Sequence, residues 1–333
     1  MPRGERPHAA EPEPAVDPQR RIVDPHHHLW DRRGSTYLAE QLLADTRATH
    51  NVTHTIFVDC MAEYEENGPE HLRPVGETRF VAAQAAQTRA AGGTEIAGIV
   101  SFADMNLGAA VEEVIAAHEM AGTGLFRGVR YATAWSDHPE VRVGHTNPPE
   151  RLMEDTKFRE GIAALGAMGH SFDAWLYFNQ LHELTAMARD LTDVSIILNH
   201  LGAPLGIGPY RDRLDDVTAR WKASMVDVAS CPNVSLKLGG IGMDDLFATG
   251  WRKLDPPPDS DLVVARWDDQ VRWCIDTFGP SRCMFESNFP VDRQALTYSV
   301  IWNAFQKIAA VYDDAEQDEM FSGTAIRVYR LET

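Results

Sequence analysis

Short apolar runs recur along most of the chain, and helical patterns rich in Ala, Glu, Leu and Arg lie between them. Eight of these runs predict buried strands, at residues 21–28, 53–60, 95–104, 126–133, 171–178, 194–200, 233–240 and 282–290. Helices are predicted between them, for instance at residues 78–91, 107–121 and 184–191, with a last one at 295–312. Strands that alternate with helices form parallel sheets with right-handed crossovers, and eight such units favour a closed (β/α)8 barrel over an open sheet.

The domain organisation follows from the same pattern. Residues 21–333 show no internal repeat and no linker, so one α/β domain, a (β/α)8 TIM barrel, is predicted. The residues before it hold five prolines and almost no apolar side chains other than alanine, which predicts a disordered N-terminal tail over residues 1–20. Two long connections, 134–170 and 241–262, follow strands and are expected over the barrel mouth, as binding loops or as decorative insertions.

Charge and cysteine usage narrow the function. The 49 acidic and 31 basic side chains give a formal charge of −18, which argues against a nucleic-acid partner because phosphates require a basic surface. An anionic small-molecule substrate would then need a local basic pocket. The chain has no apolar run long enough for a membrane span, which argues against a membrane partner. The four cysteines form no CxxC pair, so we expect reduced thiols and a cytoplasmic protein.

The segment DPHHHLWD, residues 24–31, ends the first predicted strand. His26 and His28 are two residues apart, so on a strand their side chains share one face. Two imidazoles at the carboxyl end of a barrel strand suit a zinc-like cation at a catalytic site. The alternative is a surface histidine cluster or a cloning tag, although tags are usually longer uninterrupted runs at a terminus.

A third candidate metal ligand is His200, which ends the sixth predicted strand. Strand ends converge over the barrel axis, so this side chain would meet the first-strand pair in the same mouth. The alternative is a core histidine whose hydrogen bonds are satisfied within the protein.

The eighth strand supplies candidate catalytic groups in MFESNFPVD. Glu286 and Asn288 share one face, and Asp292 follows in the loop. A metal hydrolase uses a carboxylate to complete the metal site or to take a proton from water. Glu286 could instead pair with a buried arginine, and Asp292 could cap the next helix.

Two cations sit on otherwise apolar strands, Arg130 in LFRGVRYAT and Lys237 in VSLKLGG. A guanidinium at a strand end can hold a substrate carboxylate through two parallel hydrogen bonds, and Lys237 could add a second positive charge. An internal salt bridge to an acidic side chain is the competing explanation for either residue.

These motifs, in this order, resemble the amidohydrolase-related family, and its lactonase branch most of all. The matching segments are DPHHHLWD, GVR at 128–130, NQL at 179–181, NHLGAP at 199–204, SNFPVD at 287–292 and GTAIRVYRL at 323–331. The resemblance covers residue 21 to the C-terminus and implies a distorted TIM barrel that hydrolyses ring esters. It implies that His26, His28 and His200 face the site and that Arg130 holds a substrate carboxylate.

The chain departs from the family pattern at two positions. Asn288 stands where the resemblance implies an aspartate that acts as metal ligand or base, and Asn179 replaces a histidine of many relatives. A neutral amide is no general base, so that role passes to Glu286, Asp292 or a metal-activated water. Trp135, in the connection after the fourth strand, is a further candidate for contact with substrate.

The sequence thus predicts a zinc-assisted hydrolase that opens a small, carboxylated lactone. Other divalent metals, or none, remain alternatives, because members of the resembling branch differ in whether they need a metal. A non-oxidative decarboxylase of aromatic or unsaturated acids, and a catalytically inactive metal- or ligand-binding relative, are the alternative functions. The oligomeric state stays open, with a homo-oligomer allowed.

Overall fold

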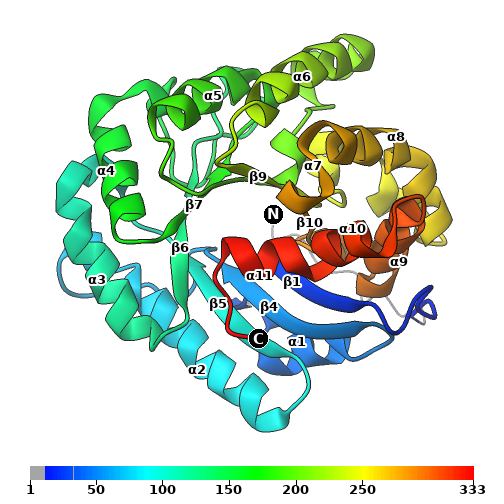
Figure 1. Ribbon diagram of the computed structural model, residues 1–333, viewed down its shortest axis with the longest axis horizontal. Helices are drawn as coiled ribbons and strands as arrows, with labels where there is room; N and C mark the ends of the chain where they lie inside the picture. The colour runs from blue at the N-terminus through cyan, green and yellow to red at the C-terminus, as the bar shows by residue number, and fades with distance from the viewer. Residues whose placement is uncertain (1–11, 33) are drawn as a thin grey trace.

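The computed structural model describes residues 12–32 and 34–333, and eight parallel strands in it form a barrel surrounded by helices (Figure 1). The strands, in their order around the barrel, are β1 (Arg21–His27), β4 (Asn51–Val58), β5 (Glu95–Ser101), β6 (Phe126–Ala132), β7 (Ser171–Trp175), β8 (Ile196–Leu198), β9 (Val234–Leu238) and β10 (Cys283–Phe285). The segment after β10 closes the ring, because His28 N donates to Phe289 O at 2.7 Å. The predicted (β/α)8 barrel is confirmed.

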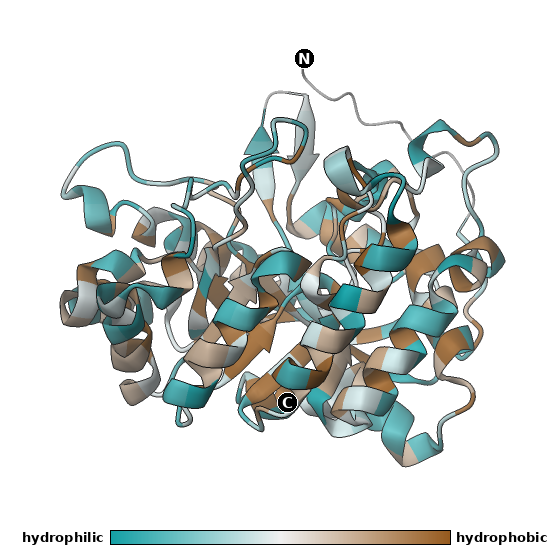
Figure 2. Cartoon of the chain, turned by 90° about the horizontal axis from the view of Figure 1, so that it is seen from above, coloured by the Kyte–Doolittle hydropathy of each residue, from teal (hydrophilic) through white to brown (hydrophobic). Residues whose placement is uncertain are grey.

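Helices cover the outside of the barrel, with hydrophobic residues gathered towards the strands and hydrophilic ones on the outer loops (Figure 2). They are α1 (Ala39–Thr46), α2 (Val75–Ala91), α3 (Val111–Gly122), α4 (Thr156–Ala167), α5 (Leu181–Asp190), α6 (Leu214–Ala229), α7 (Asp244–Phe247), α8 (Ser260–Phe278), α9 (Tyr298–Ala309), α10 (Asp314–Asp318) and α11 (Thr324–Val328). Several begin at side-chain caps, such as Asp155, whose carboxylate accepts from Phe158 N at 2.9 Å. None of the described helices is long and apolar enough to cross a bilayer.

The two ends of the barrel differ. The C-terminal segment closes the end where the strands begin, because Arg330 Nη2 donates to Arg127 O at 2.9 Å and Tyr329 is fully buried. Helix α11 lies across this end in Figure 1. The carboxyl ends of the strands and their loops are therefore left to form the site, as in other barrels of this type.

The described part of the predicted tail lies against α9. The backbone N–H groups of Glu13, Val16 and Asp17 donate to Ser299 Oγ, Asn303 Oδ1 and Gln306 Oε1 at 2.9–3.0 Å. These three acceptors share one face of α9, because they are spaced four and three residues apart. Residues 12–20 thus differ from the disorder predicted for 1–20, while residues 1–11 lie outside the described part of the chain.

Two further features were not predicted. A short hairpin joins β2 (Trp30–Arg32) to β3 (Ser35–Tyr37) directly after the histidine segment. The connection 134–170 contains α4, so its irregular part is shorter than the sequence indicated.

Candidate active site

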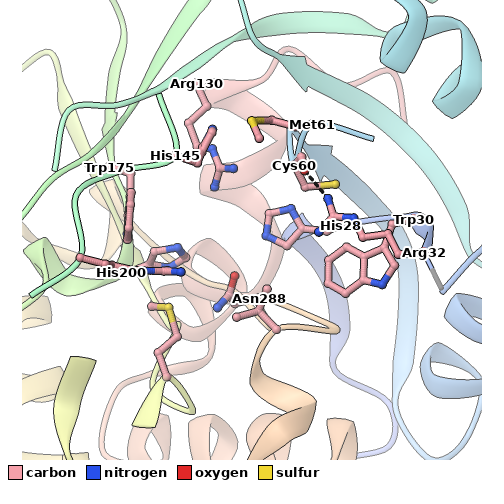
Figure 3. Close-up of a pocket in the computed structure, with 13 residues that line it drawn as sticks. His28, Trp30, Arg32, Cys60, Met61, Arg130, His145, Trp175, His200 and Asn288 are labelled. Carbon is pink, nitrogen blue, oxygen red and sulfur yellow. Dashed lines mark hydrogen bonds between the residues drawn. The ribbon is translucent and has the colours of Figure 1, made fainter. Parts of the chain in front are cut away.

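A pocket of ≈ 380 Å³ opens where the barrel strands end (Figure 3). It is lined by His28, Trp30, Arg32, Cys60, Met61, Arg130, Arg142, His145, Trp175, His200, Met243, Asn288 and Val291. These residues come from the ends of several strands and from both long connections. Arg142 and His145 follow β6, and Met243 follows β9, so both connections contribute to the wall.

The lining is positively charged although the chain as a whole is strongly acidic. It includes three arginines, and none of its described residues carries a carboxylate. Two of these arginines are exposed and lie over tryptophan rings, with Arg32 Cζ 4.9 Å from the Trp30 centroid and Arg142 Cζ 5.5 Å from that of Trp175. The pocket therefore supplies the local basic environment that an anionic ligand needs.

His200, which lines the pocket, belongs to a buried cluster of possible metal ligands. Its side chain and those of His26 and Glu286, which are not in the pocket lining, place ligand atoms within 4.8 Å of one another. Glu286 Oε1 lies 2.7 Å from His200 Nδ1, and Oε2 lies 2.6 Å from His26 Nδ1. The second contact lacks hydrogen-bond geometry, and both ring nitrogens of His26 and Glu286 Oε2 are buried without hydrogen-bond partners. Buried nitrogen and oxygen atoms that lie close together and have no hydrogen-bond partner are suited to bind a cation.

His28 lies beside this cluster, with its ring centroid 4.9 Å from that of His26. Its Nδ1 is 2.8 Å from Val58 O, and because a carbonyl only accepts, Nδ1 carries the proton. Nε2 is therefore the atom with a free lone pair, which is how metal-binding histidines are usually oriented.

Electrostatics keep two of these imidazoles neutral. Burial lowers the pKa of His26 well below its usual value, and the positive charge of Lys237 lowers it further. Burial, followed by the charge of Arg130, does the same to the pKa of His28. Neutral imidazole is the form that binds a cation, so the site favours ligation at ordinary pH.

Local sequence explains how these groups come so close. Gly239 and Gly240 follow β9, and a Cβ on them would lie 2.3 Å from Glu286 Cγ and 2.5 Å from His200 Nδ1, respectively. Only glycine leaves room for both side chains there. His200 itself has a φ of 53°, a left-handed conformation that is uncommon for a non-glycine residue and often occurs at functional sites.

Asn288 and Asp292 form a pair at the edge of the pocket. Asn288 lines the pocket, and its Nδ2 donates to Asp292 Oδ1 at 2.7 Å. The other oxygen of Asp292 accepts from Gly242 N at 2.8 Å. Burial raises the pKa of Asp292 well above its usual value. Both oxygens of this carboxyl group are thus engaged within the protein, and the residue is not part of the pocket lining.

Arg130 reaches the pocket from β6 and is held by Asp59, the residue that follows β4. Arg130 Nε donates to Asp59 Oδ1 at 2.6 Å, and Nη2 also contacts the backbone oxygen of Asp59. His145 Nε2 lies 3.2 Å from the second carboxylate oxygen. Burial alone would raise the pKa of Asp59, but the charge of Arg130 and the hydrogen bond with His145 bring it below its usual range.

Lys237 is close enough for its charge to act on His26, but it does not line the pocket. It is fully buried, and its Nζ donates to Asp173 Oδ1 at 2.8 Å. Asp173 also accepts from Tyr329 Oη at 2.8 Å and from Asn199 Nδ2 at 3.0 Å. The structure thus places Lys237 in an internal salt bridge and outside the pocket lining.

Trp135 and Asn179, predicted as contacts to substrate, also lie outside the lining. Both are half-buried, and the backbone N–H of Trp135 donates to Gln180 Oε1 at 3.0 Å. The residues that sequence reasoning missed include Asp59, Arg142, His145 and Trp175. Asp59 is the last residue but one of the strand predicted at 53–60, so its position could have revealed it, whereas the two loop residues, Arg142 and His145, carry no periodic signal.

The barrel combines a basic pocket with a buried histidine–carboxylate cluster, and comparison with known proteins specifies the family. A family profile described as Amidohydrolase matches residues 23–331, and the chain belongs to this family. The resemblance inferred from the motifs is confirmed.

Two curated relatives match along most of their length. An uncharacterized protein, y4mH of Sinorhizobium fredii, is 30% identical over 93% of this chain and 98% of its own. An L-fucono-1,5-lactonase of Burkholderia multivorans is 26% identical over 93% of this chain and 96% of its own. Among solved structures, an amidohydrolase from B. multivorans with bound zinc has a TM-score of 0.70 and 23% identity, over 93% of this chain and 99% of that one.

Proposed function

We propose that this hydrolase is a lactonase that opens the ring ester of a small, anionic lactone with a water activated by a divalent cation. The observation that carries the proposal is that His200 belongs both to the lining of the arginine-rich pocket and to the His26–His200–Glu286 cluster. A site for a reactive centre and a site for negative charge therefore share one cavity. The relative named as a lactonase supports the same reaction class.

The cation in this proposal is zinc, held by His26, His200 and Glu286, with Nε2 of His28 beside them. Nitrogen and carboxylate ligands in this combination suit zinc. A bound zinc ion acts as a Lewis acid towards the ester carbonyl and lowers the pKa of a water. The hydrogen bond from His28 to Val58 and the contact of His200 with Glu286 fix the orientations of the imidazoles before substrate arrives.

The pocket wall supplies binding and orientation. Arg130 is anchored by Asp59 and presents its guanidinium to the cavity, where it would pair with a substrate carboxylate. Arg32 and Arg142 at the rim add positive charge that attracts an anion despite the acidic chain. Asn288 cannot remove a proton, but its amide oxygen, on the pocket side in Figure 3, can accept a hydrogen bond from a water or a substrate hydroxyl.

A cytoplasmic location is part of the proposal, because all four cysteines are free. The catalytic carboxylate in the proposal is Glu286, which serves the metal site, with Asp292 as the alternative.

The test combines metal analysis with a substrate panel. Purified protein should contain about one zinc-like ion per chain and open carboxylated lactones faster than neutral ones of the same ring size. His26→Ala should lose metal and activity together. The same panel, extended to aromatic acids, should release no carbon dioxide. Decarboxylation without ring opening would instead establish a decarboxylase, and binding without turnover an inactive relative. Full activity in metal-free protein would refute the metal mechanism.

A further inference from the structure

The pocket lacks an obvious group to move protons. Among the described residues its lining contains no carboxylate, and Glu286 and Asp292, the two candidate acids, are engaged elsewhere. Glu286 lies between two histidines, and both oxygens of Asp292 accept hydrogen bonds from Asn288 and Gly242. Ring opening nevertheless requires that a proton reach the departing oxygen, because an alkoxide is a poor leaving group.

Besides His28 and His200, which belong to or lie beside the metal cluster, one further histidine faces the cavity. His145 lies in the connection after β6, its side chain is 28% exposed, and it lines the pocket. Figure 3 shows it beside Arg130, on the opposite side of the pocket from Asn288. It therefore comes from a different part of the chain from the metal cluster and lies across the cavity from the strand-end asparagine.

The contacts of His145 fix which of its nitrogens is available. Its Nε2 lies 3.2 Å from Asp59 Oδ2, and this fully buried carboxylate is already paired with Arg130. An ionised carboxylate only accepts hydrogen bonds, so it favours the tautomer in which Nε2 carries the proton. Nδ1 then keeps its lone pair for the cavity. A carboxylate that orients a histidine in this way is a recurrent arrangement in proton-transfer catalysis.

The neighbouring histidine of the same loop behaves differently. His138 Nδ1 accepts a hydrogen bond from Glu140 N at 3.3 Å, and His138 does not line the pocket. It pairs with no carboxylate among the described ion pairs. The two histidines thus provide a matched comparison within one connection.

We propose that His145 is the proton-transfer residue of ring opening, with Asp59 as the residue that positions it. Nδ1 takes one proton from the water as its oxygen forms a bond to the carbonyl carbon. The same imidazole then gives that proton to the ring oxygen as the acyl C–O bond breaks, and so returns to its starting state. The second proton of the water leaves to solvent when the new acid ionises. This proposal rests on the proposed lactonase function.

The test compares leaving groups. We expect His145→Ala to lower kcat on an oxygen lactone by about a hundredfold or more, the usual contribution of a positioned acid–base group. On the matching thiolactone the loss should be about tenfold smaller, because a thiolate leaves with little need for a proton and only the transfer from water still requires the imidazole. Metal content and unfolding temperature should not change, and His138→Ala should behave as wild type on both substrates. An equal loss on both substrates, or no loss on either, would overturn the proposal.

A second measurement does not depend on turnover. In the metal-loaded protein labelled with ¹⁵N-histidine, the signals absent from His145→Ala identify this ring, and they should show a protonated Nε2 and an unprotonated Nδ1 at neutral pH. The opposite tautomer would overturn the proposal even if the variant is slow. If wild type opens no lactone, the lactonase function fails and the ring-opening role of His145 fails with it, whereas the tautomer separately shows whether Asp59 positions His145.

Discussion

Arg130 and Lys237 are both inward-facing cations on barrel strands, each paired with a buried aspartate, yet they serve different regions. Arg130 is 6% exposed and lines the pocket with His145 nearby, whereas Lys237 is 0% exposed. Asp59, the partner of Arg130, contacts two groups that both line the cavity. Asp173, the partner of Lys237, accepts from three buried donors and faces no cavity described here.

The difference shows that residue type does not decide whether a buried ion pair is structural or functional. Taking two charges from water costs several kcal/mol per ion, and only mutual attraction and extra hydrogen bonds offset that cost. Around Lys237 the hydrogen bonds of the pair are made by protein groups: Nζ donates to Asp173, which also accepts from Asn199 and Tyr329. Around Arg130 the open cavity leaves room for a ligand to supply further ones. The Lys237–Asp173 pair is therefore expected to govern stability, and the Arg130–Asp59 pair to govern binding.

Removal of the buried positive charge of Lys237 should have the largest effect, and it should act on the stability of the fold. Lys237→Met keeps most of the side-chain volume but leaves Asp173 as an uncompensated buried charge, which should lower the free energy of unfolding by about 3–5 kcal/mol. Denaturant unfolding monitored by fluorescence measures this change. The double variant Lys237→Met with Asp173→Asn should recover part of the loss. A single variant as stable as wild type would show that the pair is not structural.

A second experiment asks which carboxylate, Glu286 or Asp292, takes part in the reaction at the pocket. Glu286→Gln should lower kcat about a hundredfold, equivalent to ~2.7 kcal/mol of barrier, and should weaken metal retention, because Glu286 contacts both His26 and His200. Asp292→Asn is the matched change and should cost far less, because Asp292 faces Asn288 and Gly242 instead of the cavity. Rates at saturating substrate and metal content decide between them. The reverse ranking would make Asp292 the functional acid.

Arg130→Lys tests the binding role of the open pair. Lysine keeps the positive charge but loses the two-pronged geometry, so KM for carboxylated lactones should rise about tenfold, ~1.4 kcal/mol, with little change in kcat. Neutral lactones of the same ring size are the control and should be almost unaffected. An equal loss on both kinds of lactone would mean that Arg130 supports the fold of the site instead of binding the carboxylate.

The barrel was predictable because its strands have short apolar runs with turns between them. The histidines were predictable as candidates for a related reason, since side chains alternate along a strand and barrel strand ends meet. The alternation of side chains along a strand does not, however, indicate how deeply each side chain is buried. The pattern around Lys237 resembled that around Arg130, and only the three-dimensional contacts show that Lys237 is enclosed by Asp173 and Tyr329.

The rest of the site depends on contacts that no local pattern encodes. His145 is 86 residues from Asp59 in sequence, and it lies in an irregular loop with no periodicity. Likewise, the segment at residues 12–20 has few apolar residues, and its position depends on three polar side chains of α9 almost 290 residues away. Such long-range polar contacts add little to the hydrophobic pattern from which the elements were predicted.

The smallest expected effects come from two tyrosine hydroxyls, one in each region. Tyr329→Phe removes one of three donors to Asp173 and should cost about 1 kcal/mol of stability with kcat and KM unchanged. Tyr177→Phe removes a hydrogen bond of 2.6 Å to Arg142 O in the pocket loop. It should cost a similar ~1 kcal/mol, but it should also raise KM, because the loop that carries Arg142 and His145 is then less firmly held. If Tyr329→Phe changes KM as much as Tyr177→Phe does, the enclosed cluster influences the pocket, and the division between the two regions is wrong.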